Sequence, residues 1–125
     1  MNTPKNLKYT KTHEWLLEED GVYVIGITDH AQSELGDIVF INLPLADSDI
    51  STGEALADVE SVKAVSDVIS PVTGVVSAVN EELADSPEKL NEQPYEAWIA
   101  KVRDVTETED LLTAEEYEAF VQSEA

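Results

Sequence analysis

The chain has no cysteine and little positive charge. Its 125 residues include 27 Asp or Glu but only 7 Lys or Arg, so its formal net charge is −20. Without cysteine, its own side chains form no disulfide, hold no iron–sulfur cluster and perform no thiol catalysis. Because contacts to phosphate need clustered Lys and Arg, nucleic acid and anionic membrane surfaces are poor candidate partners.

Long apolar runs and glycine-rich loops are also missing. No apolar run approaches the length of a membrane span, and the first residues lack a signal-peptide core and an Arg-rich transit pattern. We therefore expect a soluble, cytoplasmic protein. The five glycines are scattered at expected turns, so no phosphate-binding loop is indicated. With 27 acids, a pair of carboxylates alone does not indicate acid–base catalysis.

The remaining composition predicts one mainly β domain over residues 1–125, which we expect to be a monomer. Apolar residues make up 42% of the chain, enough for a real core. Short strands separated by turn signals are typical of small sandwiches and barrels. Strands are expected at residues 8–10 with 13–16, 22–27, 37–43, 54–60, 65–70, 75–79 and 96–102. Loops or irregular segments are expected at 47–53, 71–74 and 81–95.

Two helices are predicted from capping signals. Thr28 can cap a short helix over residues 29–35, with Gly36 as its end. Thr113 and Glu116 form a capping box that opens a C-terminal helix over about residues 113–122.

Lys63 has the most distinctive surroundings in the chain. The segment 60–67, Glu-Ser-Val-Lys-Ala-Val-Ser-Asp, is almost a mirror image of itself, and alternating strands lead into it and out of it. This pattern predicts a β-hairpin over residues 54–70 with Lys63 at its tip. Lys63 is also the only Lys or Arg between Lys11 and Lys89. An isolated amine on a tight turn indicates a covalent attachment point.

Acylation of a lysine requires an exposed neutral amine that is free of a strong ion pair. A hairpin tip provides exposure, and the small or apolar neighbours Val62 and Ala64 do not hold the ammonium. Glu60 and Asp67 lie close in sequence but can point away along the two arms. Since Lys and Ala are poor residues for positive φ, the turn is expected to avoid that conformation.

Two histidine-containing segments are further candidate sites. His13 and Glu14 precede Trp15, and their ordinary role is that of a strand edge. His30 and Glu34 are four apart on the predicted short helix, a spacing that permits a metal pair. Since two ligands do not make a metal site, a solvated helix face is expected there.

The lysine motif resembles the lipoylation motif of the glycine cleavage system H protein. The resemblance continues in the same order from about Leu7 to Phe120. It includes the opening His13-Glu14-Trp15, the stretch 25–32, Leu35-Gly36-Asp37, the stretch 70–74, and Asn91 with Trp98. It implies a barrel-sandwich hybrid of short strands, like the lipoyl domains of 2-oxoacid dehydrogenases.

The resemblance also implies a carrier that is not an enzyme. Lipoate would be attached covalently to Lys63 by a lipoate ligase or an octanoyltransferase route. The lipoyl arm would take an aminomethyl group from the pyridoxal-phosphate enzyme glycine decarboxylase and bring it to aminomethyltransferase. Dihydrolipoamide dehydrogenase would reoxidise the arm.

Further site residues follow from the family pattern. Glu60, Ser61, Val62 and Ala64 flank the attachment lysine. Glu14 and Asp67 match the acids that line the family's aminomethyl-arm cleft, and Thr12 stands where Ser is common. Glu34 stands where some relatives have His, so no cleft role is assigned to it.

The sequence also has alternative interpretations. A lipoyl or biotinyl domain of a larger complex usually has Asp or Met before the lysine, whereas this chain has Val62. A paralogue that only relays lipoate to other enzymes would have the same motif. An acidic interaction protein would leave Lys63 unmodified. A small hydrolase using His13, Glu14 and Asp67 has no other support.

Overall fold

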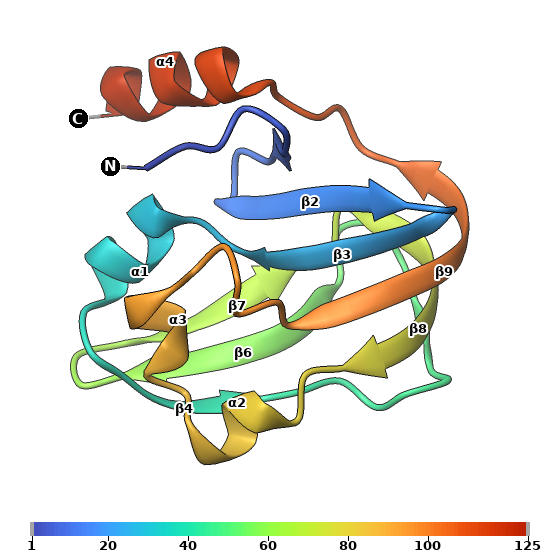
Figure 1. Ribbon diagram of the computed structural model, residues 1–125, viewed down its shortest axis with the longest axis horizontal. Coiled ribbons are helices and arrows are strands. Elements are labelled where there is room, and N and C mark those ends of the chain that lie inside the picture. The colour runs from blue at the N-terminus through green and yellow to red at the C-terminus, as the bar shows by residue number, and fades with distance from the viewer. Residues whose placement is uncertain (1, 125) are drawn as a thin grey trace.

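Two antiparallel sheets form most of the computed structural model, which describes residues 2–124 (Figure 1). The larger sheet has the order β1-β2-β3-β9-β8-β5 and the smaller has the order β4-β6-β7. The predicted mainly β fold with a short internal helix and a C-terminal helix is confirmed, although the sheets do not close into a barrel. The strands are β1 (Lys8–Tyr9), β2 (Glu14–Glu19), β3 (Val22–Ile27), β4 (Ile38–Asn42), β5 (Asp49–Ile50), β6 (Ala55–Ser61), β7 (Val65–Ile69), β8 (Val72–Val79) and β9 (Ala100–Thr108). The helices are α1 (Asp29–Leu35), α2 (Glu82–Asp85), α3 (Lys89–Glu92) and α4 (Ala114–Glu124).

The main hydrophobic core lies between the two sheets. Buried side chains of β3, β6, β8 and β9 form it, and Leu83 of α2 and Leu90 of α3 cover one side. A smaller cluster joins α4 to the first strands, where the rings of Tyr9 and Tyr117 stack with centroids 4.8 Å apart. This second cluster fixes α4 beside the N-terminal segment (Figure 1).

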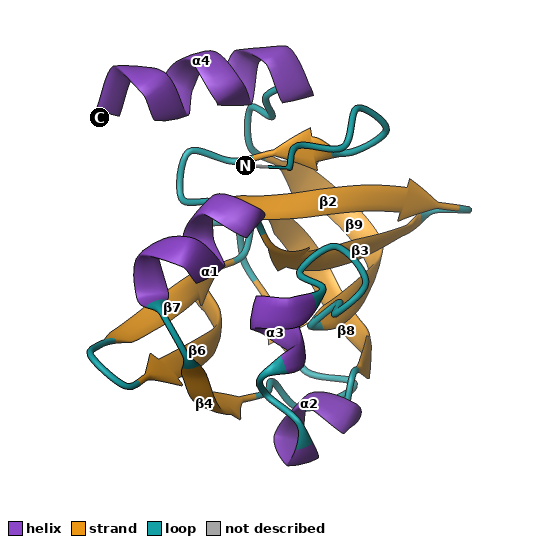
Figure 2. Cartoon of the chain, turned by 60° about the vertical axis from the view of Figure 1, so that its left-hand side comes forward, coloured by secondary structure: helices purple, strands orange, loops and turns teal. Residues whose placement is uncertain are grey.

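Helix α1 leads the chain from the larger sheet to the smaller one (Figure 2). The Thr28 side chain accepts a hydrogen bond from Ala31 N at 3.1 Å, and Gly36 ends the helix with a φ of 79°. The Asn91 side chain then holds this end, since it donates to Gly36 O and accepts from Ile38 N, both at 2.8 Å. Residues 29–35 were predicted as helix because these capping signals are local.

The predictions for the later strands were partly wrong. Strand β9 runs over Ala100–Thr108 rather than 96–102. Its outer half is mostly polar, and only pairing with β8 holds that half in the sheet. Strand β8 begins at Val72, inside the predicted turn 71–74. Position 74 of that strand requires glycine, because a Cβ there would lie 2.5 Å from Arg103 O on β9.

Short elements were also missed in two segments. The predicted loop 47–53 contains β5, which pairs with β8 through two residues. The segment 81–95, predicted as irregular with one helical turn, contains both α2 and α3. Within residues 2–124, no helix has the length and apolar character needed to cross a membrane.

Candidate functional site

Strands β6 and β7 form a hairpin (Figures 1 and 2). Lys63 lies at its tip, between Ser61 and Val65, and is exposed. Ser61 N donates to Ala64 O at 2.8 Å, and the Ser61 hydroxyl accepts from Ala64 N at 3.1 Å and Lys63 N at 3.3 Å. No residue of the turn has a positive φ, as the sequence predicted. The serine before the tip therefore holds the backbone on both sides of the lysine.

The end of α1 supports the tip from one side. Val62 N donates to Asp37 O at 3.0 Å, which joins the turn to the segment between α1 and β4. The Lys63 side chain passes Gly36, where an added Cβ would lie 3.7 Å from its Cε. Within residues 2–124, no carboxylate forms an ion pair with Lys63. The backbone of the tip is fixed, while the ammonium has no charged partner.

Glu14 lies at the start of β2 and is only 1% exposed. Its Oε1 accepts hydrogen bonds from the Thr10 hydroxyl at 2.6 Å and the Thr12 hydroxyl at 2.5 Å. Its Oε2 accepts from Ile69 N on β7 at 3.3 Å. The carboxyl group thus bridges the two sheets. A tight turn, in which His13 N donates to Thr10 O at 3.2 Å, brings the hydroxyls of Thr10 and Thr12 to this carboxyl group.

Burial raises the pKa of Glu14 from 4.5 to about 7. Hydrogen bonds from Thr10, Thr12 and Ile69 N act in the opposite direction because they stabilise the carboxylate. Near neutral pH this buried group therefore occurs in both charge states. Sequence reasoning did not identify Thr10, because its contact with Glu14 depends on the turn between Thr10 and Glu14.

A surface depression of about 280 Å³ adjoins Thr12. Its lining comes from the segment before β2, from α1, from β7 and from the end of α4: Thr12, His13, His30, Ala31, Glu34, Leu35, Ser66 and Glu124. Glu14 lies behind Thr12, to which it is hydrogen-bonded. The depression shares α1 with the Lys63 side chain, since Leu35 precedes the Gly36 that Lys63 passes.

The other predicted site residues lie in or next to the hairpin. Asp67 is exposed and pairs across the sheet with Asp58, while its neighbour Ser66 lines the depression. Glu60 of β6 pairs across the sheet with Phe40 of β4 on one side and with Val65 of β7 on the other. The structure thus brings Thr12 and Glu14 together, whereas the role of Asp67 stays a prediction.

Three groups that are far apart in sequence meet at the rim of the depression. The rings of His13 and His30 lie with centroids 4.7 Å apart, and His13 Nε2 is 3.3 Å from Glu124 Oε1. His13 Nδ1 is 2.8 Å from the hydroxyl of Tyr117. Burial, followed by the proximity of His30, lowers the pKa of His13. Sequence reasoning missed this cluster because no local signal connects the three segments.

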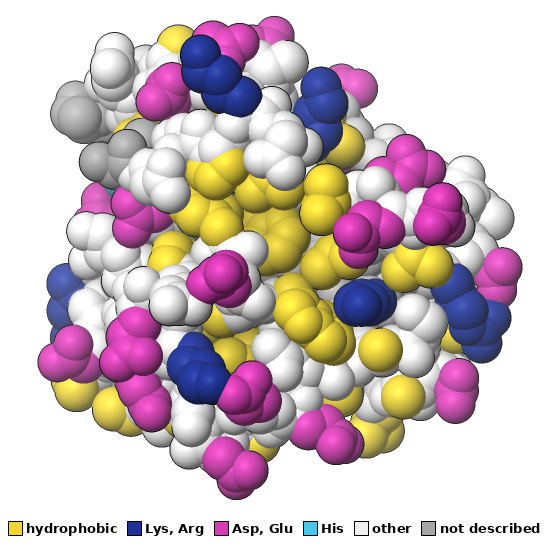
Figure 3. All heavy atoms as spheres, in the orientation of Figure 1, with side chains coloured by type: hydrophobic (Ala, Val, Ile, Leu, Met, Phe, Trp, Pro, Cys, Tyr) yellow, Lys and Arg dark blue, Asp and Glu magenta, His cyan; other side chains and the backbone are white. Residues whose placement is uncertain are grey.

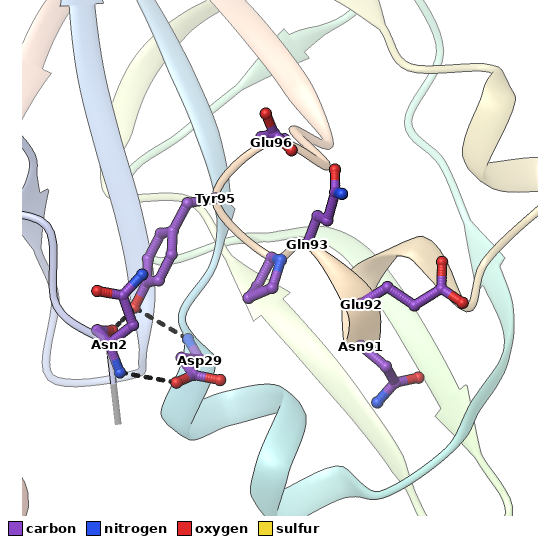
Figure 4. A pocket seen from close by; sticks show the side chains of 8 residues that line it. Asn2, Asp29, Asn91, Glu92, Gln93, Tyr95 and Glu96 are labelled. Atoms are coloured by element: carbon purple, nitrogen blue, oxygen red, sulfur yellow. Dashed lines mark hydrogen bonds between the residues drawn. The ribbon is translucent and has the colours of Figure 1, made fainter.

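A second depression, of about 380 Å³, lies at the first residue of α1 rather than at its Lys63 end (Figure 4). The hydroxyl of Tyr95 donates to Asn2 O at 2.6 Å and accepts from Asp29 N at 3.0 Å. Asn2 N donates to Asp29 Oδ2 at 2.8 Å. These polar groups already satisfy one another, so they join the N-terminal segment to α1.

Negative charge is spread over the surface rather than gathered in one site. Figure 3 shows acidic side chains around the whole of one face, with hydrophobic side chains visible over β2 and β3. Near the hairpin tip, four hydrophobic residues are strongly exposed: Val39 at 54%, Phe40 at 43%, Val62 at 69% and Val65 at 67%. Exposed apolar side chains next to a lysine offer contact area to a binding partner.

Comparisons with known proteins agree over nearly the whole chain. The family model for the glycine cleavage H-protein matches residues 7–124. A glycine cleavage system H protein from Lachnoclostridium phytofermentans is 58% identical over 125 residues, covering 99% of this chain and 98% of that protein. One from Geobacillus kaustophilus is 52% identical over 124 residues, covering 97% and 98%. A probable H protein from Pyrococcus abyssi is 53% identical over 123 residues, covering 95% and 92%.

A solved structure gives the same result for the fold. The crystal structure of a glycine cleavage system H protein from Mycobacterium marinum superposes with a TM-score of 0.89 at 38% identity. The match covers 98% of this chain and 99% of that chain. The lipoyl-domain-like fold expected from the sequence resemblance is thereby confirmed.

Proposed function

The chain belongs to the glycine cleavage H-protein family, and from that premise we propose that Lys63 is the attachment residue of a lipoyl group. Members of this family are carriers rather than enzymes. The observation that carries the proposal is the exposed ε-amine of Lys63, free of ion pairs within residues 2–124, on a turn that Ser61 holds rigid. Residues 1–125 would act as a single carrier domain and as a monomer.

The residues present fit the chemistry of attachment. An attaching enzyme would supply lipoate as an activated acyl group. The Lys63 amine would lose a proton to solvent, Nζ would attack the carboxyl carbon, and the bond from that carbon to the activating group would break. The resulting amide nitrogen carries no positive charge. Because Lys63 takes part in no ion pair in the described chain, this loss of charge breaks no existing interaction. The attached group supplies a disulfide that accepts and releases electrons and a one-carbon unit, while the protein supplies position and protection.

The depression beside Thr12 is the proposed docking place of the arm. Glu14 lies directly behind Thr12, and its carboxyl group is half ionised near pH 7. A cationic amine that enters the depression would favour the ionised form of Glu14, because an opposite charge lowers the pKa of a carboxyl group. We assign Asp67 to the same cleft on the family pattern alone.

The partners proposed are those of the glycine cleavage system. They are glycine decarboxylase, aminomethyltransferase and dihydrolipoamide dehydrogenase, together with a lipoate ligase or octanoyltransferase for attachment. A net charge of −20 favours approach to basic surfaces on such partners and makes the encounter sensitive to salt. The exposed Val62 and Val65 provide apolar contact next to the lysine.

Intact mass spectrometry of protein purified from its host tests the attachment. We expect one lipoyl increment, placed at Lys63 by tandem fragmentation, and its complete loss in Lys63→Arg with an unchanged circular dichroism spectrum. Lys89→Arg is the matched control, because Lys89 is partly exposed but pairs with Glu82. An unmodified Lys63, or lipoylation that persists in Lys63→Arg, would refute the proposal and favour an acidic interaction protein.

A second measurement separates the carrier from a paralogue that only relays lipoate. Lipoylated protein is mixed with glycine decarboxylase and glycine, and the release of CO₂ is measured. We expect release that depends on the carrier and is absent with Lys63→Arg. Normal lipoylation without any CO₂ release would identify a relay protein instead.

A further inference from the structure

His13, His30 and Glu124 come together from three parts of the fold. His13 precedes β2, His30 lies on α1, and Glu124 lies at the end of α4. One potential ligand atom from each lies within 4.8 Å of the others. We propose that these residues bind a divalent transition-metal ion of the zinc type, with Glu34 as a further ligand. This proposal goes beyond the carrier function and does not depend on lipoylation of Lys63.

The distances already approach those of a metal site. Tetrahedral zinc with bonds of about 2.0–2.2 Å holds its ligand atoms roughly 3.3–3.6 Å apart. His13 Nε2 and Glu124 Oε1 are 3.3 Å apart, and His30 Nε2 and Glu34 Oε1 are 3.6 Å apart. For both pairs to bind one ion, the imidazole rings of His13 and His30 must move toward each other. The exposed Glu124 and Glu34 side chains can rotate to follow them.

A hydrogen-bond chain behind His13 orients its ring. His13 Nδ1 and Thr28 Oγ1 each lie 2.8 Å from the hydroxyl of Tyr117, which is fully buried. With its proton on Nδ1, His13 donates to Tyr117, and Tyr117 donates to Thr28. Nε2, which lies 3.3 Å from Glu124 Oε1, then has a free lone pair for a metal ion. Metal-binding histidines usually donate their second ring nitrogen in this way.

The donor types select the kind of ion. Two imidazole nitrogens with one or two carboxylates suit zinc, nickel, cobalt or copper, whereas magnesium and calcium prefer oxygen ligands. The alternative is an ordinary histidine–glutamate ion pair. Ion pairing does not explain why the two imidazole rings lie 4.7 Å apart, because two protonated rings would repel each other.

The position of the ion would couple parts of the fold. His13, His30, Glu34 and Glu124 all line the depression of about 280 Å³ beside Thr12, so an ion would lie at its rim. It would also tie α4 to α1. Because binding to the native state alone stabilises that state, zinc should raise the thermal midpoint.

Calorimetric titration with Zn²⁺ in excess Mg²⁺ tests the site on the full-length protein with an oxidised lipoyl group. We expect one equivalent of bound Zn²⁺ and a visible absorption band of tetrahedral geometry when Co²⁺ replaces it. The affinity should fall by at least about tenfold in His30→Gln and in His13→Asn. Asparagine is chosen at position 13 because His13 has a φ of 73°, which Asn tolerates.

Two controls keep the outcome interpretable. The double substitution Glu18→Gln with Glu19→Gln removes exposed acids on β2 and should leave the affinity unchanged. Repeating the titration with Lys63→Arg excludes binding through lipoyl sulfur. Equal Zn²⁺ affinity in the parent protein and both histidine variants, with native circular dichroism, would overturn the proposal. So would the loss of all Zn²⁺ binding in excess Mg²⁺, because scattered surface acids would then account for it.

Discussion

Lys63 at the hairpin tip and Glu14, which lies behind Thr12, differ in how their side chains are held. Lys63 is exposed and takes part in no ion pair within residues 2–124. Glu14 is buried, and its carboxyl group accepts hydrogen bonds from Thr10, Thr12 and Ile69 N. The covalent attachment proposed for Lys63 requires few partners within the protein, so replacement of Lys63 should affect function alone. A buried ionisable residue contributes to stability and to pH dependence as well.

The strongest test of this contrast is the pH dependence of stability in Glu14→Gln. Between pH 4.5 and about 7, native Glu14 keeps a proton that the unfolded chain has released, so stability falls as pH rises. Glutamine cannot ionise, and it can donate to the threonine hydroxyls while accepting from Ile69 N. Relative to pH 4.5, the variant should gain roughly 3 kcal/mol over the parent above pH 7, because each pKa unit is worth about 1.36 kcal/mol.

Urea denaturation of both proteins from pH 4.5 to 8.5 measures this difference. Glu18→Gln is the control, since Glu18 is exposed on the same strand. Parallel stability curves for Glu14→Gln and the parent across the whole range would show that Glu14 is not protonated in the native state. The contrast between Lys63 and Glu14 would then rest on the hydrogen bonds of Glu14 alone.

A smaller effect is expected from Tyr117→Phe, which extends the contrast to the next buried network. The substitution keeps the ring that stacks on Tyr9 but removes the hydroxyl that meets His13 and Thr28. Loss of one partner from buried polar groups should lower the free energy of unfolding by roughly 1–2 kcal/mol. Urea denaturation at pH 7 measures it.

Tyr23→Phe serves as the matched control for that experiment. Within residues 2–124, the hydroxyl of Tyr23 takes part in no hydrogen bond. Its removal should change stability by less than about 0.5 kcal/mol. Similar losses in both variants would mean that the Thr28–Tyr117–His13 chain contributes nothing specific.

The success of sequence reasoning followed the same division. The tip was predictable because turn residues and alternating strands are neighbours in the chain: the hairpin expected over 54–70 spans β6 and β7, from Ala55 to Ile69. The helix over 29–35 was predictable for the same reason, from its caps Thr28 and Gly36.

What failed depended on contacts between distant segments. The polar half of β9 has no strand pattern of its own and is held by pairing with β8. Glu14 was singled out only through the family resemblance, since its burial depends on Ile69 N from β7. The meeting of His13 with Glu124 depends on how α4 packs through Tyr117. A list of neighbours along the chain contains none of these contacts.

The smallest expected effect on stability is at the tip itself, in Val62→Ser. Val62 is 69% exposed, so its replacement should change the free energy of unfolding by less than about 0.5 kcal/mol. The rate of lipoylation should nevertheless fall about fivefold, since an attaching enzyme that buries part of this side chain would lose about 1 kcal/mol. The measurement is kcat/KM of a lipoate ligase with the parent and variant proteins.

Leu45→Ser is the control, because Leu45 is 78% exposed but lies far from the tip. It follows the Asn42 end of β4, whereas Ile38 at the other end of β4 pairs with Ser61. Equal losses for both variants would show that the enzyme reads general surface hydrophobicity, and no loss for either would remove the apolar neighbours of Lys63 from its recognition.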